Sequence, residues 1–273
     1  MGKEHICMLQ EVKINHIYQG NCLDILKTFP DDCIDCVVTS PPYDNLRKYN
    51  GYVFDFEGIA QELYRVISPG GVIVWVVADA TVNGSETGTS FKQALYFKEI
   101  GFNLHDTMIY YRWSGPMNCN RYEQEFEYMF ILSKGKPKTF NPIIVPCKYY
   151  GIDGDRTGQK YRSHDEKNCK LRSNTGRSNV KEKRIKGNVW KLNTSAQKGE
   201  CCGHPAQFPE QLARDHILSW SNPEDIILDP MCGSGTTLKM ALENNRRYIG
   251  IEISEEYIKL AEDRIKAVQI KMF

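Results

Sequence analysis

Long apolar segments are scarce in this sequence of 273 residues. The longest apolar runs, residues 71–78 and 226–228, are far shorter than the roughly 20 residues that a membrane-spanning helix needs. Residues 1–10 contain Lys3, Glu4 and His5 but no apolar core, so no secretory signal is visible. We therefore expect a cytoplasmic protein rather than a membrane or secreted one.

Paired metal-ligand motifs are also lacking, although the sequence contains ten cysteines. Cys33 and Cys36 form one C-x-x-C pair, and the run Cys201-Cys202-Gly203-His204 forms a second cluster. A structural zinc site normally combines two such pairs at matched spacing, and no second C-x-x-C pair is present. Because Cys36 also begins a predicted strand, we expect its side chain in the core. The sequence therefore favours no metal, and reduced thiols rather than disulfides.

Net charge is small, at +1, but it is unevenly distributed. Residues 141–200 hold 14 Lys and Arg against 6 Asp and Glu, a balance of +8. The rest of the chain holds 21 against 28, a balance of −7. This polarity indicates a polyanion as the partner of the basic segment. The chain length fits one large domain, or one domain with an insertion.

Predicted strands alternate with predicted helices at both ends of the chain. Apolar patterns predict strands at residues 13–19, 34–38, 72–77, 107–112, 126–132, 226–229 and 247–252. They predict helices at residues 22–29, 56–67, 91–100, 209–220, 236–243 and 254–268. Alternating βα units imply an α/β fold with a doubly wound, mostly parallel, seven-stranded Rossmann-like sheet. Ligands of such sheets bind beyond the carboxyl ends of the strands.

Residues 138–200 interrupt this alternation, because their hydrophobic periodicity is lost. A disordered basic linker is one interpretation. The interleaved aromatic residues and the island Gly187-Asn188-Val189-Trp190 favour folded pieces instead. We therefore expect one domain in two halves, residues 1–137 and 201–273, with an inserted region at residues 138–200.

A turn with two prolines, Thr39-Ser40-Pro41-Pro42-Tyr43, follows the predicted strand 34–38. We call it the Pro-Pro corner. Each proline lacks an N–H and has a fixed φ, and each restricts the residue before it. The corner is therefore stiff and rich in carbonyl acceptors, with an aromatic ring beside it. It suits a planar amino group that donates two hydrogen bonds, although an ordinary turn with a half-buried tyrosine has the same pattern.

A second motif, the glycine loop Asp229-Pro230-Met231-Cys232-Gly233-Ser234-Gly235-Thr236-Thr237, joins a predicted strand to a helix. Glycines let the backbone approach a ligand, and a helix amino terminus attracts an anion. Glu252 ends the next strand, where a carboxylate can accept hydrogen bonds from ribose hydroxyls. The loop lacks both the third glycine of the dinucleotide fingerprint and the GK[ST] of a phosphate loop. The ligand is then a nucleoside with a carboxylate, such as S-adenosyl-L-methionine, unless the turn is only structural.

Together the two motifs resemble the S-adenosylmethionine-dependent DNA amino-methyltransferases. The family's catalytic motif (D/N/S)PP(Y/F/W) is matched by residues 40–43, and its cofactor motif DPFxGSGTT by residues 229–237. The order of catalytic motif, basic segment and cofactor loop is similar to the permuted β class. Residues 20–23 also resemble the family's GDxL, which borders the cofactor adenine, and residues 204–209 resemble its HPTQKP, which lines the cofactor pocket. The chain departs from these motifs at Asn21, Ala206, Phe208 and Met231.

The resemblance implies a methyltransferase sheet and the following roles. The catalytic residues are Ser40, Pro41, Pro42 and Tyr43. The cofactor-binding residues are Asn21, Cys22, Gln207, Asp229, Met231, Cys232, Gly233, Gly235, Thr236, Thr237, Glu252 and Ile253. The DNA-binding residues are Arg47, Lys148, Arg156, Lys160, Arg162, Arg172, Arg177, Lys183, Arg184 and Lys186. The expected partner is double-stranded DNA, and the family also allows a cognate restriction endonuclease and a homodimer.

An exocyclic amino group is a poor nucleophile, because its lone pair is conjugated into the base. The Ser40 hydroxyl and the Pro41 carbonyl are expected to accept its two protons, while Tyr43 stacks on the base. The base has to leave the duplex to reach them. Family members with Ser at the first motif position favour cytosine N4 and those with Asp favour adenine N6, so the sequence favours cytosine N4, with adenine N6 as the alternative.

Other functions fit the sequence less well. RNA and protein-glutamine methyltransferases usually place the glycine loop before the Pro-Pro turn, the reverse of this chain. A 5-methylcytosine enzyme needs a nucleophilic cysteine after proline, and Pro146-Cys147 lacks that family's surroundings. The intact motifs also argue against a DNA-binding protein with a decayed active site.

Overall fold

The computed structural model describes residues 12–42, 54–112, 120–148, 160–162, 171–173, 181–193 and 207–271. The chain divides into two compact units. The first unit comprises residues 1–141 and 188–273, and the second comprises residues 142–187. The second unit lies within the segment of residues 138–200 that we expected as an insertion.

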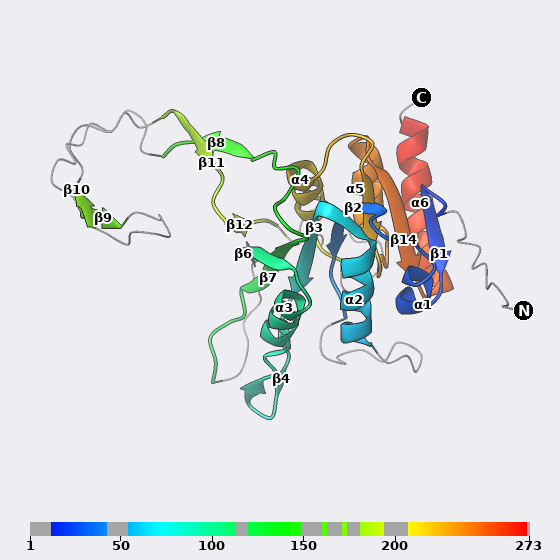
Figure 1. Ribbon diagram of the computed structural model, residues 1–273, viewed down its shortest axis with the longest axis horizontal. Helices are drawn as coiled ribbons and strands as arrows, with labels where there is room; N and C mark the ends of the chain where they lie inside the picture. The colour runs from blue at the N-terminus through cyan, green and yellow to red at the C-terminus, as the bar shows by residue number, and fades with distance from the viewer. Residues whose placement is uncertain are drawn as a thin grey trace, which may run out of the picture. The chain divides into compact units, whose positions relative to one another are not determined.

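An eight-stranded sheet forms the centre of the first unit (Figure 1). Its strand order is β1-β14-β13-β2-β3-β7-β6-β12. The strands are β1 (His16–Gln19), β2 (Ile34–Thr39), β3 (Ile67–Val77), β6 (Asn103–Tyr111), β7 (Phe126–Ser133), β12 (Val189–Lys191), β13 (Ile226–Asp229) and β14 (Arg247–Glu252). Strand β7 is antiparallel to both of its neighbours, and every other adjacent pair is parallel. The mostly parallel α/β sheet predicted from the sequence is confirmed.

The eighth strand, β12, is a correction to the seven that we predicted. It comes from the segment assigned to the insertion, and it pairs with the outer edge of β6, where Val189 lies opposite Ile109. Trp190 is buried between exposed neighbours and stacks on His216 at 4.4 Å between ring centroids. Three residues are too few for a period-2 pattern to be recognised in a basic segment.

Six helices cover the sheet in the described part of the first unit. They are α1 (Cys22–Leu26), α2 (Phe56–Val66), α3 (Thr89–Glu99), α4 (Glu210–Trp220), α5 (Thr236–Glu243) and α6 (Glu255–Lys271). Helices α1, α2 and α3 contact one another in series, and so do α4, α5 and α6. None of the helices in the described ranges has the length and apolar character needed to cross a membrane.

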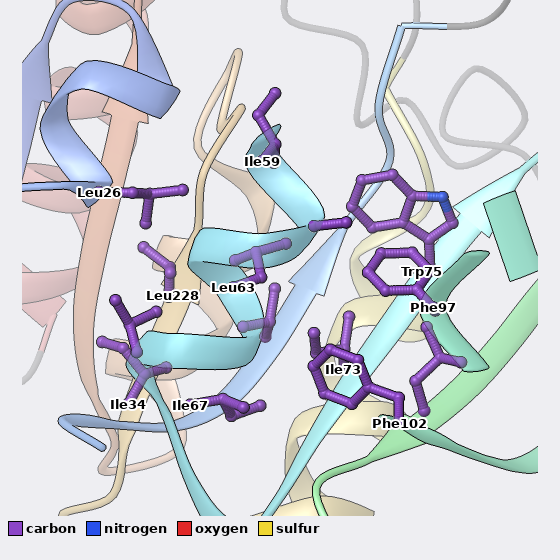
Figure 2. Close-up of a cluster of buried hydrophobic side chains, with 14 of the residues drawn as sticks. Leu26, Ile34, Ile59, Leu63, Ile67, Ile73, Trp75, Phe97, Phe102 and Leu228 are labelled. Atoms are coloured by element: carbon purple, nitrogen blue, oxygen red, sulfur yellow. The ribbon is translucent and has the colours of Figure 1, made fainter. Parts of the chain in front are cut away.

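The core explains why β3 reads as a continuous apolar run. Successive strand residues point to opposite faces of a sheet. Ile73 and Trp75 pack with α2 and α3 in the cluster that Figure 2 shows, together with Leu63 and Phe97. The alternate residues of β3 are equally buried, because α4 contacts β3 as well. Cys36 is fully buried, as predicted.

Two short strands, β4 (Thr81–Val82) and β5 (Ser85–Glu86), form a hairpin in a polar stretch to which the sequence patterns assigned neither strand nor helix. In the second unit, β8 (Ile144–Pro146) pairs antiparallel with β11 (Lys183–Ile185). Strand β9 (Lys160–Arg162) pairs with β10 (Leu171–Ser173) in the same way. The basic segment therefore contains folded pieces, as its aromatic residues suggested.

The buried pair of Trp75 and Gln93 provides a test of the core. The indole Nε1 of Trp75 donates to Gln93 Oε1 at 2.9 Å, and both side chains are buried. Trp75→Phe leaves that amide oxygen without its donor, so we expect the free energy of unfolding to fall by about 1–3 kcal/mol. Adding Gln93→Leu to Trp75→Phe removes the stranded amide and should recover about 1 kcal/mol.

Urea unfolding at a common m value measures both changes. Gln61→Ala is the matched control, because its hydrogen bond to the Tyr96 hydroxyl at 2.8 Å is exposed. The control should cost no more than about 0.5 kcal/mol. If Trp75→Phe alone and the double variant lost the same free energy of unfolding, the unpaired Gln93 amide would not be the cause of the loss.

Candidate active site

The Pro-Pro corner and the glycine loop lie side by side at the carboxyl edge of the sheet. Strands β2 and β13 are parallel neighbours, with Leu228 opposite Val37. The Thr39 hydroxyl donates to Asp229 Oδ1 at 2.7 Å. The Thr237 hydroxyl donates to the Val38 carbonyl at 3.0 Å. The first hydrogen bond joins the two motifs directly, and the second joins the glycine loop to the strand residue just before the corner.

The Pro-Pro corner follows the last residue of β2. Ser40 and Pro42 are partly exposed, and Pro41 is buried. Thr39 lies opposite Trp75 in the parallel strand β3, which fixes the level at which the corner leaves the sheet. Tyr43 and Arg47 lie outside the described residues.

Asp229 is buried at the junction of the two motifs, with only 2% of its surface exposed. Burial raises its pKa to about 6, and the nearby Glu252 carboxylate acts in the same direction. Hydrogen bonds from the Thr39 hydroxyl and the Met231 N–H, together with the nearby Thr237 hydroxyl, partly offset this effect by stabilising the charged form. The charge of this carboxyl therefore changes close to neutral pH.

The glycine loop needs glycine at two positions. Gly233 and Gly235 have φ values of 47° and 74°, in the left-handed region that disfavours other residues. A Cβ on Gly235 would lie 2.7 Å from the Ala261 Cβ on α6. Between the glycines and β13, Cys232 is buried, and burial raises the pKa of its thiol. Burial therefore disfavours the thiolate form of Cys232.

Glu252, at the end of β14, holds the glycine loop from one side. Its Oε2 accepts the Gly233 N–H at 2.8 Å, and its Oε1 accepts the N–H groups of Ile253 and Ser254, both at 2.9 Å. A carboxylate has about four acceptor sites. Three are used by the backbone, so acceptor capacity remains for a ribose hydroxyl.

The segment that resembles GDxL lies beside Glu252. The Gly20 N–H donates to the Glu252 carbonyl at 2.9 Å, and β1 pairs with β14. The Asn21 side chain caps α1 by accepting the Leu23 N–H at 2.9 Å. Burial raises the pKa of Cys22 to about 12. The structure thus brings Asn21 and Cys22 to the same edge as the glycine loop.

An ionic network that the sequence did not reveal lies behind the glycine loop. The Arg264 guanidinium, on α6, donates to the Ser234 carbonyl at 2.7 Å and to the Thr236 hydroxyl at 3.0 Å. It also pairs with Glu210 at 2.7 Å, and Lys239 pairs with the same Glu210 oxygen at 2.7 Å. Burial alone would raise the pKa of Glu210, but the two cations outweigh it and lower the pKa.

This network connects two of the motifs. Glu210 begins α4 directly after Gln207-Phe208-Pro209, which belongs to the segment that resembles HPTQKP. No signal in the sequence identified Arg264, because it is one of many charged residues in a helix that reads as a solvated surface.

The predicted DNA-binding residues other than Arg47 belong to the second unit, residues 142–187. Lys148, Lys183, Arg184 and Lys186 belong to the second unit, where the first three are exposed and Lys186 is partly exposed. The backbones of three more lie on β9 and β10, at Lys160, Arg162 and Arg172. Arg156 and Arg177 lie outside the described residues, as do Cys201, Cys202 and His204. Among the residues that the structure does describe, no group of His, Cys, Asp and Glu is placed to hold a metal ion.

Comparison with known proteins identifies the family. Residues 34–263 match the family model described as DNA methylase, N6_N4_Mtase. The orphan methyltransferase M.BamHII of Bacillus amyloliquefaciens is 55% identical over 250 residues, which cover 86% of this chain and 90% of that protein.

Solved structures share the fold. The cytosine-N4-specific PvuII DNA methyltransferase superposes with a TM-score of 0.66 at 17% identity, covering 95% of this chain and 91% of that one. TTHA0409 of Thermus thermophilus, solved as a complex with S-adenosyl-L-methionine, gives a TM-score of 0.61 at 23% identity, covering 92% and 95%.

The family model spans most of the chain, and the relative from Bacillus amyloliquefaciens matches nearly end to end. The methyltransferase fold and the S-adenosyl-L-methionine cofactor predicted from the two motifs are confirmed. The chain belongs to the N6/N4 DNA methylase family and is an S-adenosylmethionine-dependent DNA amino-methyltransferase.

Proposed function

We propose that this enzyme methylates cytosine N4 within a specific sequence of double-stranded DNA, after flipping the cytosine out of the duplex. The observation that carries the proposal is the hydrogen bond from Thr39 to Asp229. It sets the acceptor-rich Pro-Pro corner beside the loop assigned to the methyl donor. We assign the catalytic and cofactor-binding halves of the domain to residues 1–137 and 201–273, and target recognition to the insertion at residues 138–200.

In this proposal the Ser40 hydroxyl and the Pro41 carbonyl accept the two protons of the exocyclic amino group. Electron density then shifts from the ring towards the nitrogen. Tyr43 stacks on the flipped base, which contributes about 1–3 kcal/mol in other proteins that stack bases on aromatic rings. The cofactor supplies an electrophilic methyl group. A C–N bond forms as the S–C bond breaks, and one amino proton is released to solvent.

Much of the rate enhancement then comes from positioning. Glu252 and Arg264 hold the backbone of the glycine loop, so the loop is shaped before the cofactor arrives. The ionised Asp229 carboxylate lies beneath it and attracts the ammonium group of the cofactor's methionine part. Asn21, Cys22 and Gln207 complete the proposed pocket.

Ser40 supports cytosine N4 as the target, because family members with serine at this position favour that base. Adenine N6 is the second candidate, since a hydroxyl can accept one amino proton from either base. The proposed setting is the cytoplasm. M.BamHII is named an orphan methyltransferase, so we propose that this enzyme acts without a cognate restriction endonuclease. We also propose that the enzyme forms a homodimer.

The charge and strand structure of the second unit support a role for it in recognising the DNA sequence. It holds 12 Lys and Arg against 5 Asp and Glu, a balance of +7 within residues 142–187. A two-stranded ribbon such as β8 with β11 fits the major groove of DNA. On one face of this ribbon, Ile144 lies opposite Ile185, and the two are 51% and 54% exposed. Exposed apolar side chains suit contact with thymine methyl groups, and the neighbouring cations suit phosphates.

Expression in a methylation-free host, followed by single-molecule sequencing of its DNA, tests the proposed reaction. We expect N4-methylcytosine in one sequence context. Ser40→Ala should reduce methylation by about tenfold or more, because one of the two amino-proton acceptors is removed. Detection of N6-methyladenine instead would show that adenine, and not cytosine, is the target base. The absence of any modified base would contradict DNA methylation.

Lys183→Gln, Arg184→Gln and Lys186→Gln, combined in one chain, test the DNA-binding role of the second unit. The logarithm of DNA affinity falls with the logarithm of salt concentration, with a slope of about 0.9 for each phosphate that the protein neutralises. The slope should therefore be smaller by about 0.9 for each phosphate contact that the variant loses. The measurement is plasmid binding across a salt series. Lys259→Gln with Lys266→Gln is the control, because both side chains are exposed on α6 at 70% and 64%. Equal slopes for the two variants would show that the substituted residues of the second unit do not contact DNA phosphates.

The pKa of Asp229 predicts how cofactor binding depends on pH. Only the charged form attracts the ammonium group, and the pKa of about 6 means that this form is lost as pH falls from 7 to 5. S-adenosylmethionine should therefore bind about tenfold more weakly at pH 5 than at pH 7. Titration calorimetry at several pH values measures the effect. Asp229→Asn should bind weakly at every pH, and parallel pH curves for wild type and variant would contradict the assignment.

A further inference from the structure

The β4–β5 hairpin extends beyond the Pro-Pro corner on the same edge of the sheet. Thr39 lies opposite Trp75 in the parallel strand β3, so Ser40, Pro41 and Pro42 leave the sheet at the level of residues 76–78. The hairpin begins three residues later, at Thr81. Figure 1 shows it as a separate projection past α3. The corner and the hairpin therefore both lie beyond the carboxyl ends of the neighbouring parallel strands β2 and β3.

The hairpin has a tight two-residue turn. Val82 pairs with Ser85, and Asn83 and Gly84 between them have φ values of 50° and 78°. Positive φ at both central residues is the requirement of a type I′ turn, for which Asn-Gly is the preferred sequence. The Thr87 N–H donates to the Ala80 carbonyl at 3.0 Å and closes the base of the hairpin.

Contacts on two sides hold the hairpin in place. Asp79 accepts the Ser90 N–H at 2.8 Å and so anchors the stem to the start of α3. Arg121, from the segment before β7, donates to the Gly84 carbonyl and pairs with Glu86 at 3.5 Å. An isolated two-stranded hairpin is only marginally stable in water, so these contacts preserve a shape that the hairpin would not keep alone.

The surface of the hairpin is uncharged at its tip. All residues from 81 to 86 are exposed, and Val82 is 53% exposed. Glu86 is the one ionisable residue among them, and Arg121 pairs with it. The hairpin's own residues therefore offer an apolar group, an amide and hydroxyls, and the cation beside them, Arg121, is paired with Glu86. This chemistry suits base faces and base edges rather than the DNA backbone.

We propose that the β4–β5 hairpin enters the duplex beside the target and occupies the space that the flipped base leaves. This inference rests on the proposed function. Val82 contacts the faces of the flanking bases, and the Asn83 amide hydrogen-bonds to the edge of the base that has lost its partner. Apolar side chains inserted between bases are a known way of holding DNA in a distorted form. The contacts offset part of the cost of unpairing the target.

Two variants and two substrates test the inference. In the first variant, residues 81–86 are replaced by Asn-Gly, which can join Ala80 to Thr87 because these residues are already hydrogen-bonded. The second is Val82→Ala. The control is Leu95→Ala, because Leu95 is 64% exposed on the neighbouring helix α3. One substrate is a duplex with the site mapped by sequencing, and the other has an abasic site opposite the target base.

For the shortened hairpin, we expect kcat/KM to fall by about tenfold or more on the paired duplex, and by less than about twofold on the abasic one, where the target has no partner to lose. Val82→Ala should show a smaller loss of the same kind, and Leu95→Ala none. Equal losses on both substrates, or no loss on either, would overturn the inference. Failure of the wild-type enzyme on both substrates would instead contradict the proposed function.

Discussion

One buried hydrogen bond, from the Thr39 hydroxyl to the Asp229 carboxyl, joins segments that are 190 residues apart in the chain. It forms because β2 and β13 are parallel neighbours whose carboxyl ends reach the same edge of the sheet. The bond from Thr237 to the Val38 carbonyl reinforces the junction. Sheet register, rather than loop conformation, therefore sets the separation of the Pro-Pro corner from the glycine loop. The strands that determine it are almost fully buried, so the geometry is rigid.

The glycine loop is shaped from two other directions. Glu252 accepts three backbone N–H groups around it, and Arg264 donates to the Ser234 carbonyl and the Thr236 hydroxyl. Because these groups are already in place, a ligand that binds there does not require the loop to be ordered first, which lowers the entropic cost of association. Each support comes from a different element, so the chain ends of three strands and the last helix converge on one loop.

The sequence was sufficient to predict the fold class and to place both motifs directly after strands. Continuous β-branched runs such as that in β3, and turns rich in glycine or proline after strands, are local signals. The features that escaped prediction depend on distant contacts. Strand β12 is three residues long and exists because β6 offers a free edge. The hairpin at Asn83 and Gly84 was hidden in a polar stretch, and Arg264 is recognisable only once α6 lies against the glycine loop.

A crystal structure with S-adenosylmethionine and a duplex carrying the methylated site tests the central claim most directly. We expect the cofactor sulfur above the carboxyl ends of β13 and β2, with its methyl group directed at the amino nitrogen of a flipped base. Ser40 and Pro41 should accept the protons of that nitrogen. A cofactor bound at the amino ends of the strands, or a base held away from the Pro-Pro corner, would contradict the account.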